Sequence, residues 1–154
     1  MVTLQDNLTV TQIYDQSIIT TLLREYDNEY LTPLSKRLPS LSSYAEKLAK
    51  YAKVISLQNP EGENVGFAAY YINNPEGGMA YLTQIVVKSK FRGCGAGSFL
   101  LQSFITDAKE HNFKLCKLEV NNNNIPAIKL YSKYGFETKD EASPESHYME
   151  LSLE

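Results

Sequence analysis

Residues 84–98 read Gln-Ile-Val-Val-Lys-Ser-Lys-Phe-Arg-Gly-Cys-Gly-Ala-Gly-Ser, and this stretch decides the fold. An apolar, β-branched run, Ile85 to Val87, leads through a short polar turn into a cluster of three glycines. A long amphipathic segment follows directly from Ser98. β-Branched runs are typical of strands, and apolar residues at helical spacing are typical of a packed helix. The stretch therefore predicts a strand, a glycine loop and a helix.

A glycine loop before a helix has a chemical use. The first N–H groups of a helix lack partners within it, and the helix dipole adds positive potential at that end. Such a terminus binds phosphate groups. Glycines at 93, 95 and 97 let the backbone approach an anion closely, and Arg92 can offer a guanidinium to it. The loop therefore predicts a diphosphate as ligand.

Three classes of glycine loop compete for this segment. A P-loop needs Lys followed by Ser or Thr after its last glycine, and neither pair follows Gly97. A dinucleotide loop needs G-x-G-x-x-G with an acidic residue about 20 positions later. The glycines here run G-x-G-x-G, although Glu119 keeps a weak version of that interpretation open on spacing alone. The coenzyme A pattern, [Arg/Gln]-x-x-Gly-x-[Gly/Ala], is matched at every fixed position by residues 92–97.

A second block lies at residues 124–136 and reads Asn-Ile-Pro-Ala-Ile-Lys-Leu-Tyr-Ser-Lys-Tyr-Gly-Phe. It is similar to the N-x-x-A-x-x-L-Y-x-x-x-G-F segment of the GNAT superfamily of acyl-CoA-dependent N-acetyltransferases. With both motifs, the chain resembles that superfamily. The resemblance is close over residues 64–137 and covers the rest only in the order of elements.

The composition bounds the class of protein. A chain of 154 residues, 43% hydrophobic and 21% charged, is ordinary for one globular domain, so a single domain over residues 1–154 is expected. A formal net charge of −3 argues against a nucleic-acid partner. Two cysteines, Cys94 and Cys116, and two histidines give neither a disulfide framework nor ligand spacing for zinc. No metal is expected, and both thiols should be free.

The chain has no apolar run of about 18 residues, which a membrane helix would need. Residues 1–6 lack the basic start and apolar core of a signal peptide. The sequence therefore predicts a cytoplasmic protein without a membrane partner.

Periodicity and turn chemistry predict the elements. Strands are expected at 8–14, 53–58, 65–72, 79–87, 114–120, 136–138 and 148–153. Helices are expected from an Asp15 cap to residue 30, from a cap at Ser42 or Ser43 to Ala52, after the glycines to about residue 111, and from an Asn124 cap to Gly135.

Connections then predict how the strands pair. Short turns between residues 53 and 87 favour an antiparallel meander, whereas the helical connection after Val87 favours a parallel neighbour. The result is an α/β (α+β mixed) fold with a central, mostly antiparallel sheet of about seven strands and about four helices. Its order is β-α-α-β-β-β-α-β-α-β-β, as in the family. A Rossmann-type nucleotide binder does not fit, because in that fold the glycines follow the first strand of a βαβ unit, whereas here they follow three strands that are expected to be antiparallel.

The resemblance implies a role for each motif. Backbone groups of the strand before the loop would bind the pantetheine arm and the acetyl carbonyl, and loop amides would bind the diphosphate. Arg92 would contact phosphate, although it could also be a surface charge. Asn124 would contact the pantetheine region, although N-capping also explains it. The residues concerned are Ile85, Val86, Val87, Arg92, Gly93, Cys94, Gly95, Ala96, Gly97, Ser98 and Asn124.

Tyr131 matches the tyrosine of the family's L-Y pair, which implies that it is the general acid for the departing thiolate. A phenol with a pKa near 10 is protonated at neutral pH and can donate without an unusual shift. The alternative is a tyrosine that only packs in the core, since the chain contains eleven.

The general base is left open. Residues 79–87 contain no acid, and Gln84 cannot take a proton. Glu119, Glu25, Glu29, a chain of waters, or an amine that arrives neutral all remain. In the family, the first helices and the strand at 65–72 border the acceptor site, so the resemblance makes Tyr26, Tyr30, Tyr70 and Tyr71 candidates to line it, together with Glu119. These tyrosines could equally be core residues.

The predicted function is transfer of an acetyl group from acetyl-CoA to a primary amine of a small molecule or protein, by direct attack in a ternary complex. The alternative is an acyl-CoA sensor without turnover, which the missing strand acid favours and Tyr131 opposes. Family members often form dimers, so a homodimer is compatible with the resemblance, but no residue locates an interface.

Overall fold

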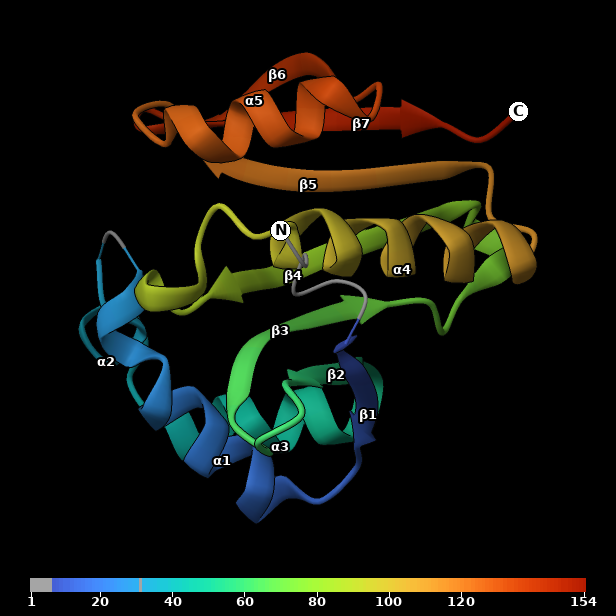
Figure 1. Cartoon of the computed structure of the whole chain (residues 1–154). Helices are drawn as coiled ribbons and strands as arrows, with labels where there is room; N and C mark the ends of the chain where they lie inside the picture. Colours follow the sequence, from blue (N-terminus) through green and yellow to red (C-terminus); the bar gives the residue numbers. More distant parts are fainter. Residues whose placement is uncertain (1–6, 31) are drawn as a thin grey trace. The chain divides into compact units, whose positions relative to one another are not determined.

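Seven strands form one sheet within residues 7–30 and 32–154, which the computed structural model of the protein describes (Figure 1). The strand order is β1-β2-β3-β4-β5-β7-β6. The strands are β1 (Thr9–Ile13), β2 (Lys53–Gln58), β3 (Asn64–Tyr71), β4 (Met79–Val87), β5 (Leu115–Asn121), β6 (Glu137–Ser143) and β7 (Ser146–Ser152).

The one parallel ladder that was predicted is present. β4 pairs with β5 in parallel, from Met79 opposite Leu115 to Leu82 opposite Leu118. β4 continues to Val87 beyond the end of this ladder, so main-chain groups of Ile85 to Val87 take no part in it. β1 with β2, β5 with β7 and β6 with β7 are antiparallel pairs. The predicted mixed, mostly antiparallel sheet is confirmed.

Five α-helices occur among the described residues, one more than predicted. They are α1 (Gln16–Glu25), α2 (Leu34–Arg37), α3 (Leu41–Tyr51), α4 (Ala96–Glu110) and α5 (Ile125–Lys133), with 3₁₀ turns η2 (Asp27–Glu29), η3 (Pro75–Gly77) and η4 (Ser89–Phe91). The additional helix, α2, lies between Pro33 and Pro39, where the sequence predicted only a break. Proline is tolerated just before a helix, and one turn forms there around the buried Leu34.

Most helix boundaries follow the predicted caps. The Asp15 side chain accepts hydrogen bonds from the amides of Ser17 and Ile18, and Asn112 takes a left-handed φ of 63° after α4. Two boundaries were wrong. The first helix ends at Glu25, because the chain tightens into η2 instead of continuing to residue 30. The second is capped by Ser40, whose hydroxyl lies 3.1 Å from the Ser43 amide.

The last two strands are longer than predicted. β6 and β7 flank a connection of two residues, Pro144 and Glu145, where a longer polar loop was expected. β6 lies at the edge of the sheet and is largely exposed, so it lacks the alternation of apolar residues that reveals a strand. The residues of β6 are mostly polar because most of their side chains are exposed to solvent.

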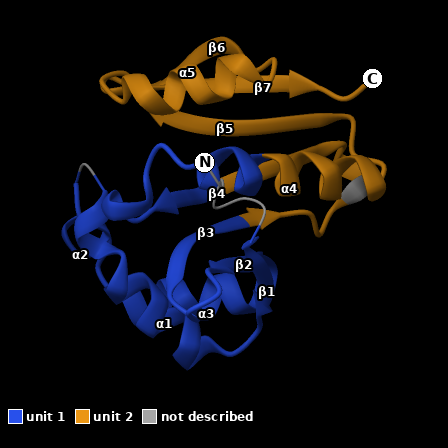
Figure 2. Ribbon diagram, in the orientation of Figure 1, with its two compact units in different colours: residues 1–69, 84–101 blue, residues 70–83, 102–154 orange. Residues whose placement is uncertain are grey.

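The chain divides into two compact units, residues 1–69 with 84–101 and residues 70–83 with 102–154 (Figure 2). In the first unit, the rings of Tyr26 and Phe67 lie 5.0 Å apart in the core. In the second, Tyr70 and Phe104 make a similar contact at 5.0 Å. The prediction of a single domain is not tested by this division.

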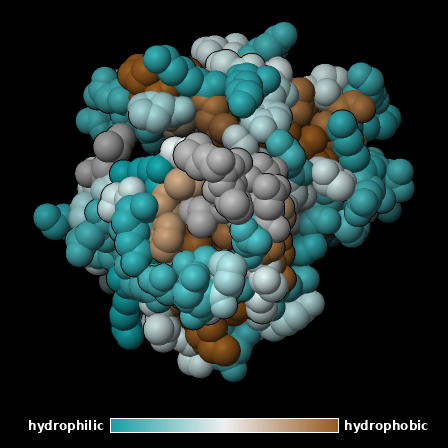
Figure 3. Space-filling view, in the orientation of Figure 1, coloured by the Kyte–Doolittle hydropathy of each residue, from teal (hydrophilic) through white to brown (hydrophobic). Residues whose placement is uncertain are grey.

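Hydrophilic residues cover most of the face shown in Figure 3, and hydrophobic residues appear there in separate groups. None of the helices in the described part of the chain has the length and apolar character needed to cross a membrane. Within the same residues, no three His, Cys, Asp or Glu side chains gather in a way that could hold a metal ion. The signal-peptide expectation concerns residues 1–6, which lie outside the described residues.

Candidate functional site

The end of β4 is packed tightly against β3 in the first unit. A Cβ atom on Gly66 would lie 2.8 Å from the carbonyl oxygen of Val86 and 3.2 Å from Cδ1 of Leu100. Only glycine permits this approach, because real Cβ contacts essentially never fall below 3.0 Å. The amide of Lys88 also donates to the carbonyl of Val65 at 3.0 Å. The backbone of residues 85–87 is therefore fixed from the β3 side.

The glycine loop has the conformation that its sequence requires. Gly93 and Gly95 take φ values of 81° and 88°, which side chains rarely permit. A Cβ on Gly93 would meet no atom within 4 Å, so space beside the loop is open there. The amide of Phe99 is bonded to the carbonyl of Gly95, and the amides of the first turn before it have no partner inside α4. The loop can therefore accept an anion.

Arg92 is held by a residue far away in the sequence. Its Nη2 donates to the main-chain carbonyl of Glu29 at 3.1 Å and lies 3.3 Å from the Glu29 carboxylate. Its Nε donates to the carbonyl of Val87 at 3.2 Å. The amide of Ser89 donates to the same Glu29 carboxylate at 3.0 Å. The sequence offered no signal for this contact, because it joins residues 63 positions apart.

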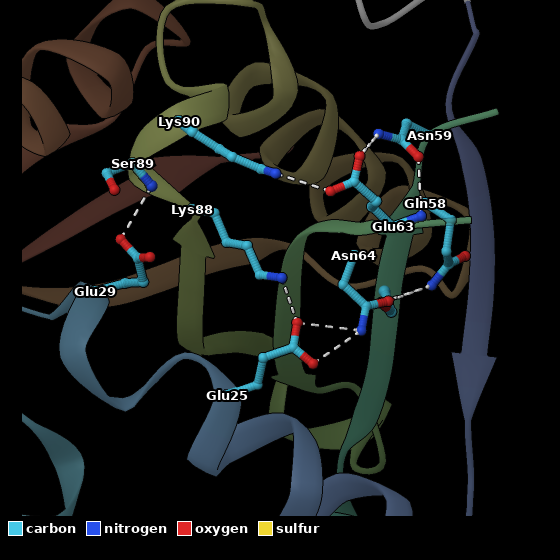
Figure 4. Close-up of polar contacts among 10 residues, drawn as sticks. Glu25, Glu29, Gln58, Asn59, Glu63, Asn64, Lys88, Ser89 and Lys90 are labelled. Carbon is cyan, nitrogen blue, oxygen red and sulfur yellow. Dashed lines mark hydrogen bonds and ion pairs between the residues drawn. The ribbon is translucent and has the colours of Figure 1, made fainter. Parts of the chain in front are cut away.

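A wider set of polar contacts surrounds this turn (Figure 4). Lys88 forms an ion pair with Glu25, whose carboxylate also accepts from the side-chain amide of Asn64 at 3.2 Å. Lys90 pairs with Glu63 at 2.8 Å. The polar turn between β4 and the glycines is thereby attached to α1 and to the turn between β2 and β3. Glu25 and Glu29 are both engaged in ion pairs.

Two of the predicted acceptor residues, Tyr26 and Tyr30, lie in this first unit. Tyr26 is fully buried, and the hydroxyl oxygens of both residues are buried without a hydrogen-bond partner among the described residues. Burial raises the pKa of both phenols above the ordinary range. Gln84 on β4 donates from Nε2 to the hydroxyl of Tyr44 at 2.8 Å. Contact of Tyr26 and Tyr30 with an acceptor stays a prediction.

Tyr131 belongs to the second unit and lies on α5. Its side chain is 5% exposed, and its ring centroid lies 6.0 Å from that of Phe136. Its hydroxyl makes no hydrogen bond to any residue that the structure describes. Burial raises the pKa of the Tyr131 phenol, so the group stays protonated at neutral pH. Such a hydroxyl can donate a proton to an incoming group.

Asn124 has the predicted capping geometry. Its Oδ1 accepts from the amide of Ala127 at 3.4 Å, Pro126 lies in the first turn, and Gly135 closes the far end with a φ of 96°. The side-chain Nδ2 has no partner among the described residues. The N-cap prediction is confirmed, and contact of Nδ2 with a ligand stays a prediction.

Glu119 and Tyr70 also lie in the second unit. Glu119 is exposed on β5, and its Oε2 accepts from the hydroxyl of Ser146 at 2.6 Å. It forms no ion pair with a described residue, unlike Glu25 and Glu29. Tyr70 is fully buried, and its hydroxyl lies 2.5 Å from a carboxylate oxygen of Asp107. Burial and this carboxylate raise the pKa of Tyr70. A contact of Tyr70 with an acceptor is untested.

The thiols have different surroundings. Cys116 is buried in the second unit, and burial raises its pKa to about 12. Cys94 is partly exposed in the glycine loop, with its Sγ 3.9 Å from the carbonyl of Arg92. Both are free, as predicted.

The candidate site residues fall into both compact units. The first unit contains residues 85–98 and Glu29, and the second contains Asn124, Tyr131 and Glu119.

Comparison with known proteins gives one family. The sequence model of the acetyltransferase (GNAT) family matches residues 17–136. The chain is 32% identical over 101 residues to a spermine/spermidine N(1)-acetyltransferase of Bacillus subtilis (strain 168), covering 62% of this chain and 66% of that protein. It is 31% identical over 106 residues to an N-alpha-acetyltransferase of Sulfolobus acidocaldarius, covering 60% and 61%. The chain therefore spans just under two thirds of these relatives.

Solved structures agree on the fold. The ribosomal-protein-S18-alanine N-acetyltransferase from Escherichia coli matches with a TM-score of 0.75 at 18% identity, covering 95% of this chain and 94% of that one. A putative acyl-CoA N-acyltransferase from Klebsiella pneumoniae matches with a TM-score of 0.67 at 22% identity, covering 96% and 98%. At such identities the likeness concerns the fold alone, and it confirms the predicted fold class.

Proposed function

Because the chain belongs to the acetyltransferase (GNAT) family, we propose that it transfers the acetyl group of acetyl-CoA to a primary amine. The observation that carries this proposal is the glycine loop at the start of α4, where Gly93 and Gly95 take left-handed conformations and the space beside Gly93 is open. The buried, protonated Tyr131 supports turnover in addition to binding.

The loop fits the diphosphate of acetyl-CoA. Amides from Gly93 to Ser98 would hold the phosphate oxygens, since helix N-termini bind such groups. Arg92 is 54% exposed at its side chain, so part of the guanidinium is still open to a phosphate while Glu29 holds Nη2. Main-chain groups of Ile85, Val86 and Val87 would hold the pantetheine arm, and Nδ2 of Asn124 would donate to it.

The chemistry asks little of the protein, because acetyl-CoA supplies an activated thioester. The amine nitrogen forms a bond to the acetyl carbon as the carbon–sulfur bond breaks, which yields an amide and free coenzyme A. Tyr131 gives its proton to the departing sulfur. A base takes the proton that the nitrogen loses. Proton transfer by a positioned side chain contributes about 10²- to 10⁴-fold.

Glu119 is the base that the contacts favour. Glu25 is paired with Lys88, and Glu29 with Arg92, so each carboxylate already serves a cation. Glu119 is exposed and bonded only to a neutral hydroxyl among the described residues. Of the three carboxylates, only that of Glu119 has no cationic partner among the described residues.

The acceptor is a small-molecule amine or the N-terminal amine of a protein. The Bacillus subtilis relative is named for spermine and spermidine, and the Sulfolobus acidocaldarius relative for N-alpha acetylation. Both names refer to primary amines. We place the reaction in the cytoplasm, without a nucleic-acid, membrane or metal requirement, and in a monomer or homodimer.

Calorimetric titration with acetyl-CoA, CoA and NAD tests the binding step first. We expect acetyl-CoA and CoA to bind and NAD not to bind. An amine panel of polyamines, lysine and N-terminal peptides then tests turnover through release of free thiol. Tyr131→Phe should lower turnover strongly and leave acetyl-CoA affinity nearly unchanged. Binding of acetyl-CoA without turnover on any amine would favour the sensor alternative, and absence of CoA binding would overturn the proposal.

A further inference from the structure

A chain of hydrogen bonds ends on the Glu119 carboxylate, and all of its members lie in the second unit. The hydroxyl of Ser146 donates to Oε2 of Glu119 at 2.6 Å. The hydroxyl oxygen of Ser143 lies 2.8 Å from that of Ser146. The main-chain amide of Glu145 donates to the Ser143 oxygen at 3.1 Å. Three consecutive bonds thus run from the backbone of the β6–β7 turn to a side chain on β5.

The direction of these bonds is fixed by the number of protons. A serine hydroxyl has one proton to donate, and an ionised carboxylate can only accept. The Ser146 proton is committed to Glu119, so the Ser146 oxygen must accept from Ser143. The Ser143 oxygen in turn accepts from the amide of Glu145. Every donor therefore points toward Glu119, and bonds aligned in this way strengthen one another.

Strand register explains why Ser146 reaches this carboxylate. Glu119 is opposite Tyr148, and Ser146 is opposite Asn121, so Glu119 and Ser146 are diagonal neighbours on one face of the β5–β7 pair. Ser146 is only 7% exposed, whereas Glu119 is exposed. The amide of Asn122 also donates to the carbonyl of Glu145 at 2.8 Å, which ties the turn to the end of β5. A buried anchor therefore holds a carboxylate that opens to solvent.

We propose that Ser146, supported by Ser143, is a positioning residue that orients the Glu119 carboxylate for proton transfer. This inference rests on the proposed function, in which Glu119 is the base. A neutral hydroxyl fixes one oxygen of the carboxylate and leaves the negative charge of the carboxylate in place. A lysine or arginine partner would instead offset that charge. Oε1 is left to meet the amine. The Pro144–Glu145 turn, which looks like a plain connection in the sequence, thereby sets the geometry of the base.

Removal of the hydroxyl tests the proposal directly. Ser146→Ala should lower kcat about tenfold, because a misplaced base transfers protons poorly, while KM for acetyl-CoA stays unchanged. Ser143→Ala should give a smaller fall in the same direction. Ser146→Thr, which keeps a hydroxyl, should recover most of the activity. Ser152→Ala is the matched control. It removes a serine hydroxyl at the other end of β7, and within the described part of the chain this hydroxyl bonds only the amide of Glu154.

A double variant separates positioning from structural support. In a Glu119→Gln background the base is absent, so adding Ser146→Ala should cause no further fall in kcat. Additive losses in the double variant would mean that Ser146 only stabilises the hairpin, and would overturn the inference. Thermal unfolding of each variant shows whether it is folded, and Ser143→Ala replaces Ser146→Ala if the latter is not.

A second readout does not need an acceptor. The ¹³C NMR signal of the Glu119 side-chain carboxylate should move in Ser146→Ala and in Ser143→Ala, and should stay in place in Ser152→Ala. An unmoved signal overturns the hydrogen-bond chain, whatever the activity. If the wild-type protein acetylates no amine, the proposed function is overturned. A moved signal in the two serine variants would then show that the hydrogen-bond chain to Glu119 is present and that only the assigned reaction is wrong. If Glu119→Gln keeps full activity, the positioning role is overturned while acetyl transfer stands.

Discussion

Arg92 lies against Glu29, with Nη2 3.1 Å from the Glu29 carbonyl oxygen and 3.3 Å from its carboxylate. The same carboxylate accepts from the amide of Ser89, so one side chain holds two points of the segment that leads into the glycine loop. A negative charge beside Arg92 also offsets part of the attraction that the guanidinium exerts on phosphate.

Two substitutions at Glu29 should therefore have opposite effects. Glu29→Gln keeps an acceptor for Ser89 and Arg92 but removes the charge, so CoA should bind about two- to fivefold more tightly at low salt, as expected for one partly exposed charge pair. Glu29→Ala removes the acceptor as well, and binding should weaken. Calorimetry at two salt concentrations measures both, and weaker binding by Glu29→Gln would contradict the charge argument.

Gly66→Ala should damage the binding strand. The new Cβ would lie 2.8 Å from the carbonyl oxygen of Val86, a backbone atom that can move only with β4. Overpacking of this kind costs about 1–3 kcal/mol of the free energy of unfolding. We also expect weaker acetyl-CoA binding, because residues 85–87 would shift. Gly77→Ala controls for the loss of a glycine without a backbone clash, since the three atoms nearest to its Cβ position all belong to the Asn74 side chain, the closest at 3.3 Å. Unaltered acetyl-CoA affinity in a folded Gly66→Ala protein would argue against a ligand role for this backbone.

Substitutions of Asn124 can separate its two roles. Asn124→Asp keeps the oxygen that caps α5 and removes the Nδ2 donor, so stability should be retained while acetyl-CoA affinity falls. Asn124→Ala removes both groups and should also cost about 1 kcal/mol of stability. Urea unfolding and calorimetry on the two variants distinguish these effects. Equal acetyl-CoA affinity in Asn124→Asp and the wild type would leave capping as the role of this residue.

High pH should weaken the fold through its buried tyrosines. Burial raises the pKa of Tyr26, Tyr30, Tyr70 and Tyr131. Above about pH 10 the unfolded chain loses these protons while the folded protein retains them, so stability is complete below pH 10 and declines above it. Each such group lowers the free energy of unfolding by up to about 1.4 kcal/mol per pH unit. Urea unfolding between pH 8 and 11 should show the decline.

The contribution of one tyrosine to this loss of stability at high pH can be measured separately. Tyr131→Phe removes a buried phenol that has no hydrogen bond to a described residue, and the decline should become shallower. Tyr14→Phe is the control, because Tyr14 is 74% exposed. An identical decline in Tyr131→Phe and the wild type would mean that Tyr131 ionises as easily when folded as when unfolded.

The sequence predicted those parts of the fold that depend on local pattern. β2 and β4 begin and end at the predicted residues, and Asp15, Asn112 and Gly135 have the predicted roles at helix ends, because strands and caps are encoded by neighbouring residues. β6 was largely missed, since an exposed edge strand needs no apolar alternation. α2 was missed because one helical turn between two prolines has no period to detect.

The candidate site likewise contains features that local sequence patterns predict and features that they do not. The glycine loop and the position of Tyr131 on α5 follow from motifs of a few residues. The contacts of Glu29 with Arg92 and of Ser146 with Glu119 join residues 63 and 27 positions apart, and nothing in one sequence shows such pairs. The sequence named Glu29 and Glu119 as equivalent candidate bases, and only their partners in space distinguish them.

The hold of Glu29 on Ser89 and Arg92 also limits how this protein can be re-engineered. The segment from α1 to α3 carries Tyr26 and Tyr30, which are candidates to line the acceptor site, so it is a natural piece to exchange between relatives when a new amine is wanted. A graft that lacks a side-chain hydrogen-bond acceptor at position 29 would release the turn before the glycines. A designer would then mistake the resulting loss of coenzyme A binding for misfolding of the chimera. Donor segments should therefore be chosen first by the residue that they bring to position 29.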